Sequence, residues 1–209
     1  LAQTKPDLVI ACYGMNDGIY LPWSEERFGQ FKDGSVRLHA AAVKAGAKIL
    51  HVTPPTYEDA RGGKAGYAAV LDRYAAWLVG QRGTANWDVV DLHTPMQRHL
   101  DEQWKRDPAY YLSKDGVHAG DTGHWIMARE ILRHLGARDL AAAAGPAEMA
   151  ARHPRGAEIA KLVGQRHALA RDAWLSATGH LRPGMKAGLP LAEAQARAAE
   201  LDRQIAALQ

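Results

Sequence analysis

Two short clusters of polar residues have the types and spacing that could do chemistry. Gly14-Met15-Asn16-Asp17 directly follows an apolar segment, and Asp115-Gly116-Val117-His118 lies in a glycine-rich stretch much later in the chain. The Asn16 amide could donate a hydrogen bond to an oxygen on which negative charge develops. A carboxylate three residues before an imidazole can hold the ring's Nδ1–H and leave Nε2 as a base. Each cluster alone could equally be a turn or a capped loop, because Asn, Asp and Gly favour both.

The segments around these clusters predict the elements that would position them. Apolar segments indicate strands at residues 8–12, 48–53 and 87–92, and helical periodicity follows at residues 25–45, 67–79 and 125–135. Strands alternating with helices favour a parallel sheet with helices on both faces, whose sites lie at the carboxyl ends of the strands. The uninterrupted apolar run of the first strand predicts a central strand that is covered on both faces.

In this order, separated by two further strand–helix units, the two clusters resemble the SGNH (GDSL) hydrolase family. Its third conserved block contains Gly-x-Asn-Asp and its fifth contains Asp-x-x-His. The resemblance covers about residues 5–136. It implies an α/β fold, a flavodoxin-like three-layer sandwich with a parallel sheet, that hydrolyses acyl esters with a Ser-His-Asp arrangement.

Matched position by position, the resemblance makes His118 the general base, Asp115 its orienting acid and Asn16 the oxyanion-hole donor. Met15 and Asp17, on either side of Asn16, are candidate substrate-binding residues. The expected activity is that of a serine esterase acting on acyl esters, with acetyl as the expected group and a small-molecule or carbohydrate ester as the substrate.

The chain departs from the family pattern at its start. The family's Gly-Asp-Ser block, which holds the nucleophile, and a second block with an oxyanion-hole glycine both precede Gly-x-Asn-Asp, yet residues 1–13 contain no serine. The four serines of the chain fit structural roles in a helix cap, helices and a loop: Ser24, Ser35, Ser113 and Ser176. We therefore expect the N-terminal strands and the nucleophile to come from a preceding segment or a separate chain. The alternative is a non-catalytic binding or partner fragment that keeps the fold without the nucleophile.

Two other interpretations of the histidines are weaker. Asp115, His118, Asp121 and His124 recur every three residues and could ligate zinc or iron, but the glycines among them disfavour a helix that would align all four. His93, close to Asp91, could be a second base, although a strand-terminal Asp-x-His is more typical of loop hydrogen bonding. We expect neither a metal nor another cofactor.

Composition limits the remaining possibilities. The net charge of +3 comes without a basic cluster, so a nucleic-acid partner is not expected. No apolar run reaches the roughly 18 residues that a membrane-spanning helix needs, and no signal segment opens the chain. The single cysteine, Cys12, excludes an intrachain disulfide and leaves the compartment open, with a secreted or periplasmic location compatible.

The sequence also predicts a division into two parts. Residues 1–137 form the α/β part, and residues 138–209 form a helical extension with helices at about 157–178 and 191–208. The stretch from Trp174 to Gly184 between them mixes aromatic, imidazole and guanidinium groups, and resembles tails of large bacterial esterases of the same family that act on carbohydrates. It could line a substrate cleft, but Pro183 and Gly184 are equally typical of a turn between two helices.

Overall fold

Three parallel strands form the sheet of the N-terminal part of the chain. The computed structural model describes all residues except 181–183 and 185. β1 (Leu8–Cys12), β2 (Lys48–Val52) and β3 (Asp88–Val90) lie in the order β1-β2-β3. The register pairs Leu8 with Lys48 and Val52 with Val90. The parallel α/β arrangement predicted from the sequence is confirmed.

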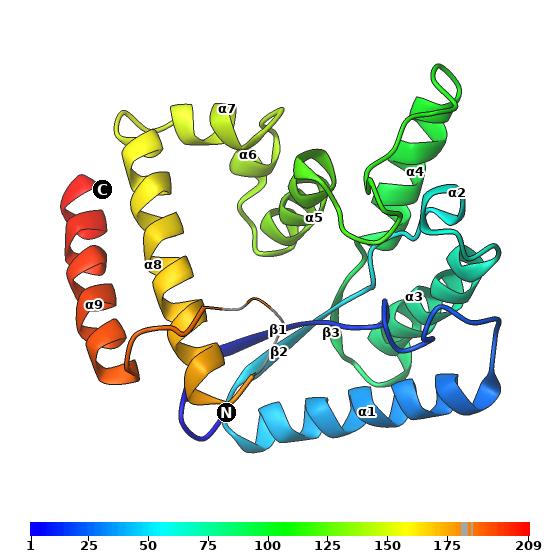
Figure 1. The fold of residues 1–209 in the computed structure, drawn as a ribbon, viewed down its shortest axis with the longest axis horizontal. Helices are drawn as coiled ribbons and strands as arrows, with labels where there is room; N and C mark the ends of the chain where they lie inside the picture. The colour runs from blue at the N-terminus through cyan, green and yellow to red at the C-terminus, as the bar shows by residue number, and fades with distance from the viewer. Residues whose placement is uncertain (181–183, 185) are drawn as a thin grey trace. The chain divides into compact units, whose positions relative to one another are not determined.

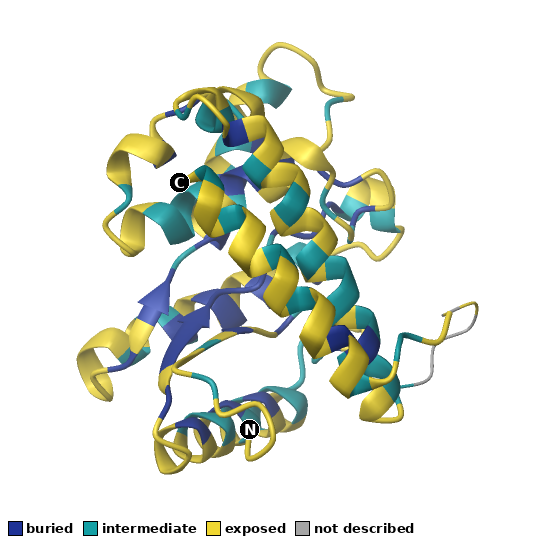
Figure 2. Ribbon diagram, turned by 90° about the vertical axis from the view of Figure 1, so that its left-hand side faces the viewer, coloured by how far each residue is buried: buried dark blue, intermediate teal, exposed yellow. Residues whose placement is uncertain are grey.

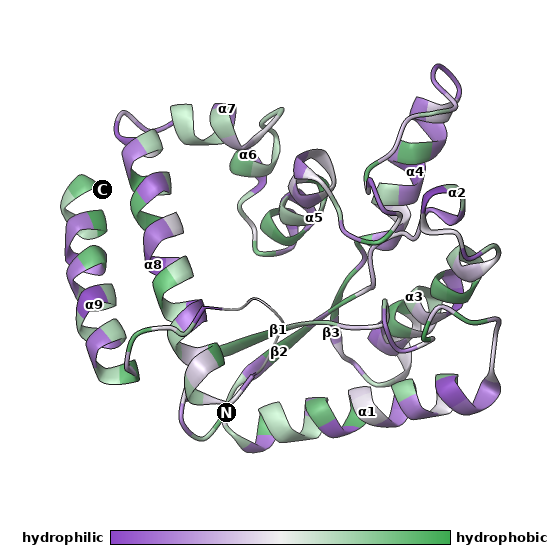
Figure 3. Cartoon of the chain, viewed as in Figure 1, coloured by the Kyte–Doolittle hydropathy of each residue, from purple (hydrophilic) through white to green (hydrophobic). Residues whose placement is uncertain are grey.

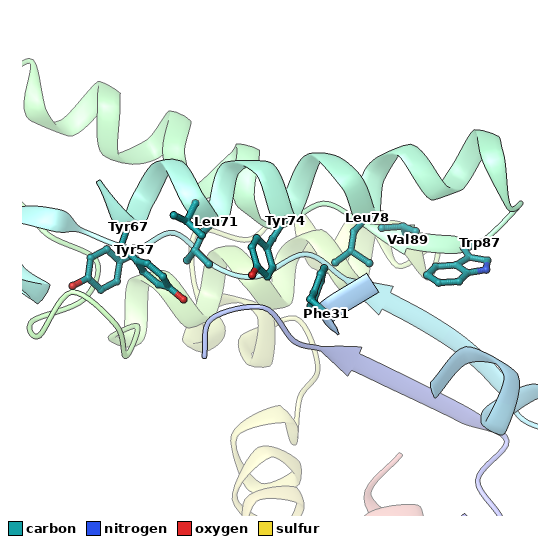
Figure 4. Packing of buried hydrophobic residues seen from close by; sticks show 9 residues of the cluster. Phe31, Tyr57, Tyr67, Leu71, Tyr74, Leu78, Trp87 and Val89 are labelled. Atoms are coloured by element: carbon teal, nitrogen blue, oxygen red, sulfur yellow. The ribbon is translucent and has the colours of Figure 1, made fainter. Parts of the chain in front are cut away.

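Helices cover the two faces of this sheet, so that the fold has three layers (Figure 1). On one face lie α1 (Glu25–Lys44) and α3 (Tyr67–Thr84), whose Phe31 and Leu71 pack with Val89 in the largest buried cluster (Figure 4). On the other face lies α5 (Asp121–His134), whose Met127 and Ile131 pack against Leu50, Val52, Val90 and Leu92. The alternation of side chains along β2 and β3 explains why neighbouring residues belong to different clusters.

β1 is not the covered central strand that its apolar sequence predicts. In the described part of the chain it pairs only with β2 and is an edge strand. Leu8 is 39% exposed and Ile10 is 48% exposed, although Figure 3 shows that the strand is apolar. α1 covers the face of β1 that carries Val9 and Ala11, where both pack with Ala42. The side chains of Leu8 and Ile10 point to the opposite face, where β1 lacks such a cover.

Two helices of the N-terminal part have no counterpart in the sequence prediction. α2 (Asp59–Gly62) is one turn, and α4 (His93–Trp104) begins directly after β3, where the prediction placed only the end of the third strand. α4 buries Met96 and Leu100, which are four residues apart and pack with Ile126 of α5. The sequence did not predict this helix because only one narrow stripe of it reaches the core. The apolar residues of that stripe lie between two polar stretches, so the helical periodicity is weak.

The structure divides into two compact units, Leu1–Ala142 and Ala143–Gln209. α6 (Arg138–Ala141) ends the first unit. The second unit contains α7 (Pro146–Ala151), α8 (Gly156–Ala177) and α9 (Leu191–Leu208), and α8 packs against α9. Within α8 and α9 the buried residues are Gly156, Ala173 and Ala194, so most of both helices is accessible (Figure 2). In the described part of the chain, no helix is both long and apolar enough to cross a membrane.

Candidate active site

Asp115 and His118 form a hydrogen-bonded pair at the surface of the first unit. Asp115 Oδ2 lies 2.7 Å from His118 Nδ1, and Asp115 Oδ1 accepts hydrogen bonds from the backbone N–H groups of Val117 and His118 at 3.0 and 2.8 Å. These bonds, led by the one from the His118 ring, hold the pKa of Asp115 well below its usual value. The His118 side chain is 84% exposed, so its Nε2 is open to a reacting group.

The loop that carries this pair is held by a buried carboxylate, Glu58, which the sequence did not reveal. Glu58 Oε1 accepts hydrogen bonds from the backbone N–H groups of Leu112 and Ser113 at 3.0 and 2.6 Å, and the Glu58 backbone N–H donates to Gly116 O. Glu58 is 4% exposed, and this burial raises its pKa. The carboxylate therefore fixes the start of the loop three residues before Asp115.

Gly116 lets the same loop approach α2 closely. Its φ is +78°, and a Cβ atom there would lie 2.3 Å from the backbone nitrogen of Gly62 and 2.8 Å from the backbone oxygen of Glu58. Both the left-handed conformation and the contact require glycine. The glycine between Asp115 and His118 is therefore a packing requirement of the loop.

Asn16 lies in a tight turn at the carboxyl end of β1. Gly14, with φ +120°, comes so close to the Pro54 ring that a Cβ atom would lie 3.0 Å from it. Asp17 Oδ2 accepts a hydrogen bond from the Gly14 backbone N–H at 2.8 Å, and Met15 O accepts one from the Tyr67 hydroxyl at 2.7 Å. The carboxylate of Asp17 and the carbonyl group of Met15 thus hold the turn, while the side chain of Asn16 is exposed.

Tyr20 contacts Asn16, and no pattern in the sequence indicated this role. Its hydroxyl donates a hydrogen bond to Asn16 Oδ1 at 2.5 Å. Burial raises the pKa of Tyr20, and the Asp115 carboxylate raises it further. Tyr20 and Val117 both pack against the same buried cluster. The structure thus brings Asn16 to the same part of the first unit as the Asp115–His118 loop.

Each of the four serines caps a helix, lies within a helix or is buried in the described part of the chain. Ser24 caps α1 by accepting from the Arg27 backbone N–H, and Ser35 is buried and donates to a carbonyl group within α1. Ser113 is 1% exposed and faces the core beside Glu58. Ser176 lies in α8 and accepts from the Gly188 backbone N–H, in the second unit.

The alternative assignments of the histidines gain no support from the geometry. His93 is buried, with Nε2 2.7 Å from Asp72 Oδ1 and Nδ1 3.3 Å from Pro54 O, so both nitrogens are engaged in structural contacts. Among the described residues, no group of three or more His, Cys, Asp or Glu side chains is placed to hold a metal ion. Arg182 and Pro183, part of the proposed cleft-lining stretch, lie outside the described residues.

Comparison with solved structures finds enzymes with a similar fold. Acetylxylan esterase Axe2 from Geobacillus stearothermophilus is 24% identical with a TM-score of 0.50, and the match covers 65% of this chain and 62% of that one. LAE5, an α/β hydrolase from the metagenome of Lake Arreo in Spain, is 22% identical with a TM-score of 0.50 and the same coverage. A gut microbial diltiazem-metabolizing enzyme is 18% identical with a TM-score of 0.51, covering 65% of this chain and 34% of that one.

These matches span less than two thirds of the length of each solved chain. No curated protein matches the sequence at a significant level. The family model for GDSL-like lipases and acylhydrolases matches residues 1–126, which is more than half of the chain and includes both the Asn16 turn and the Asp115–His118 loop. The chain therefore belongs to the GDSL-like lipase/acylhydrolase family.

Proposed function

We propose that this chain carries the general base and the oxyanion donor of an SGNH-type serine esterase that hydrolyses acyl esters. His118 is the base, Asp115 orients it, and Asn16 donates to the oxyanion. The observation that carries the proposal is the hydrogen bond of 2.7 Å between His118 Nδ1 and the Asp115 carboxylate. Two backbone N–H groups of the same loop also donate to this carboxylate and hold it in place. This arrangement leaves Nε2 exposed and directed away from its partner.

The chemistry follows from these positions. His118 Nε2 takes the proton from a serine hydroxyl as its oxygen attacks the ester carbonyl carbon. The negative charge on the former carbonyl oxygen accepts a hydrogen bond from the Asn16 amide. His118 then gives its proton to the departing alcohol. Water next attacks the acyl-enzyme: His118 takes a proton from the water and returns it to the serine oxygen as the acid leaves.

We place the nucleophilic serine on a segment outside residues 1–209. Two features support this proposal. The serines of the chain are engaged in caps, helices and the core, and the apolar β1 is an exposed edge beside a cavity of about 250 Å³. A further strand would pair with the free edge of β1, and a helix joined to it would cover the face that carries Leu8 and Ile10. Such a strand would end at the edge of the sheet where Asn16 lies.

The expected substrate is an acetyl ester, with a carbohydrate as the alcohol. Acetylxylan esterase is among the structures with a similar fold, and variants of it that replace a serine or an aspartate by alanine are described as catalytic mutants.

The test uses the protein expressed together with the residues that precede Leu1. It should hydrolyse p-nitrophenyl acetate, and His118→Ala should lower kcat by roughly 10⁴-fold or more. His124→Ala, which removes an exposed histidine on α5, is the matched control and should leave the rate unchanged. Acetylated xylo-oligosaccharides should be deacetylated faster than the unnatural ester. Turnover that is the same in His118→Ala as in the unmodified protein would overturn the assignment.

A second candidate function is that of a non-catalytic binding fragment. The serines favour it: the hydroxyl groups of Ser24, Ser35 and Ser176 are hydrogen-bonded within the fold, and Ser113 is buried. A base without a nucleophile cannot form an acyl-enzyme. This candidate predicts no hydrolysis of any acyl ester, but binding of an acetylated oligosaccharide that isothermal titration calorimetry would detect.

A further inference from the structure

Tyr20 stands out among the residues around Asn16, because its hydroxyl is engaged by the oxygen of the Asn16 side chain. The donor–acceptor distance is 2.5 Å. A side-chain amide has an oxygen that accepts and a nitrogen that donates, and the two are nearly equal in shape. With Oδ1 facing the Tyr20 hydroxyl, the Asn16 NH₂ group has to point the other way. We propose that Tyr20 is a positioning residue that fixes which end of the Asn16 amide faces the developing oxyanion.

The alternative orientation explains why such a residue would matter. An Asn16 side chain rotated by half a turn would present its carbonyl oxygen where negative charge develops. That oxygen would repel the charge, whereas the NH₂ group stabilises it. Asn16 is exposed, so its neighbours do not select the orientation by packing alone. The Tyr20 hydroxyl favours the observed orientation, because it donates to Asn16 Oδ1. An NH₂ group turned toward it would donate to the phenol oxygen instead, and the phenol proton would lose Asn16 as its acceptor.

The Tyr20 ring is itself held in place. Its centroid lies 5.0 Å from that of Tyr67 and 5.9 Å from that of Tyr57, and both of these tyrosines are buried. The Tyr67 hydroxyl donates to Met15 O, directly before Asn16. The same aromatic cluster therefore fixes the backbone of the turn and the phenol that touches its amide.

The backbone of the turn adopts an unfavourable conformation at Tyr20 and at the residue before it. Ile19 and Tyr20 both have left-handed conformations, with φ of 47° and 57°. This region is unfavourable for residues with a side chain, and most of all for a β-branched one such as Ile19. The two left-handed residues turn the chain back, and the Ile19 backbone N–H donates to Asn16 O at 3.1 Å. The strain therefore coincides with the contact between Tyr20 and Asn16.

The phenol also stays protonated in this environment. Burial raises the pKa of Tyr20, and the negative Asp115 carboxylate raises it further. A protonated hydroxyl is what the contact requires, because a phenolate cannot donate to the amide oxygen. Tyr20 thus remains a donor beyond the pH at which a free tyrosine loses its proton.

The experiment rests on the proposed function and uses the same protein, expressed with the residues that precede Leu1. Tyr20→Phe should lower kcat on p-nitrophenyl acetate by roughly 10- to 100-fold with KM little changed, because the donor is misplaced rather than removed. Asn16→Ala should lower kcat by roughly 10²- to 10³-fold. Tyr110→Phe is the matched control. It removes a tyrosine hydroxyl that bonds His99 at 2.9 Å, and it should leave kcat unchanged.

The double variant separates positioning from an independent role. Since Tyr20 acts through Asn16, Tyr20→Phe should add nothing in the Asn16→Ala background. A full additional loss in the double variant, or wild-type kcat in Tyr20→Phe, would overturn the inference while leaving the esterase proposal intact. Unchanged turnover in His118→Ala would instead overturn the esterase proposal.

A second measurement keeps the inference testable if Tyr20→Phe fails to fold. A fluorinated tyrosine at position 20 keeps the ring and the hydroxyl but loses its proton at lower pH. If Tyr20 orients Asn16 by donation, kcat should fall on the alkaline side at a correspondingly lower pH. An alkaline limb that does not move would contradict the inference, because a purely structural ring would not respond to the acidity of its hydroxyl.

Discussion

Replacing Glu58 by leucine should destabilise the loop that carries Asp115 and His118, whereas replacing it by glutamine should not. Glu58 Oε1 accepts two backbone hydrogen bonds at 3.0 and 2.6 Å, and the residue is 4% exposed. Leucine accepts no hydrogen bond and fills a similar volume, so water has little room to replace the carboxylate. Glutamine keeps one side-chain carbonyl oxygen, which is enough because both bonds end on the same atom.

The magnitude follows from these two bonds. A hydrogen bond to a charged group contributes about 1.5–3 kcal/mol, so the pair contributes about 3–6 kcal/mol. The cost of burying the carboxylate, which also raises its pKa, offsets part of this sum. We expect Glu58→Leu to lower the free energy of unfolding by about 2–4 kcal/mol, and Glu58→Gln to change it by about 1 kcal/mol or less. Domains have about 5–15 kcal/mol in total, so the leucine variant should still fold.

Equilibrium unfolding in urea and steady-state hydrolysis together check this expectation. The urea midpoint should fall in Glu58→Leu and stay near that of the unmodified protein in Glu58→Gln. The kcat value should fall by roughly 10- to 100-fold in the leucine variant alone, because a loosened loop misplaces His118. Equal midpoints for the two variants would refute the reasoning, since it depends on the acceptor oxygen.

Three further predictions concern pH and the sheet edge. The pKa of Asp115 is depressed by its bonds from the His118 ring and from backbone N–H groups, so the stability contributed by this pair is complete above the unfolded value of 3.8 and is lost as pH falls through the lower folded value. Carbon-13 NMR should therefore show Asp115 titrating below pH 3.8, and nearer to it in His118→Ala; the same midpoint in both proteins would contradict the role of the ring. Burial, together with neighbouring His39, lowers the pKa of His51 from 6.5 to about 4. Between these two pH values the unfolded state binds more protons than the folded state, so the free energy of unfolding decreases by about 3 kcal/mol as the pH falls from 6.5 to 4. His51→Phe should flatten the dependence of the urea midpoint on pH, and an unaltered slope would show that His51 is not its source. Residues 1–209 alone should self-associate through the exposed edge at Leu8 and Ile10, and a sharp monomeric light-scattering profile would count against this.

The sequence predicted those features that depend on neighbours along the chain. β1, β2 and α1 have the predicted positions, because apolar runs and the Ser24 cap are local signals. α5 begins four residues earlier than expected, at Asp121, because its first turn is polar and hides the periodicity. The contact between Asp115 and His118 is also local, because three residues in a tight loop bring a carboxylate to the ring.

Pairing across the sheet decided what the sequence could not. The apolar run of β1 predicts a strand covered on both faces, whereas the structure has it at an edge with one face exposed. The hydropathy of a strand indicates that its side chains avoid water, but it does not identify the segments that pair with the strand or cover its faces. α4 was missed for a related reason, since its two buried apolar residues, Met96 and Leu100, reach the core only through contact with α5.

By itself, the sequence determined the family, the order of strands and helices, and the residues that could act as base, orienting acid and oxyanion donor, because each of these is written in short motifs and local periodicity. Only the tertiary structure identified Glu58 and Tyr20. Glu58 reaches backbone groups more than fifty residues away, and Tyr20 depends on a left-handed turn and on a ring cluster drawn from separate elements. Contacts of this kind depend on how distant segments pack together, and the spacing of residues along the sequence does not indicate them.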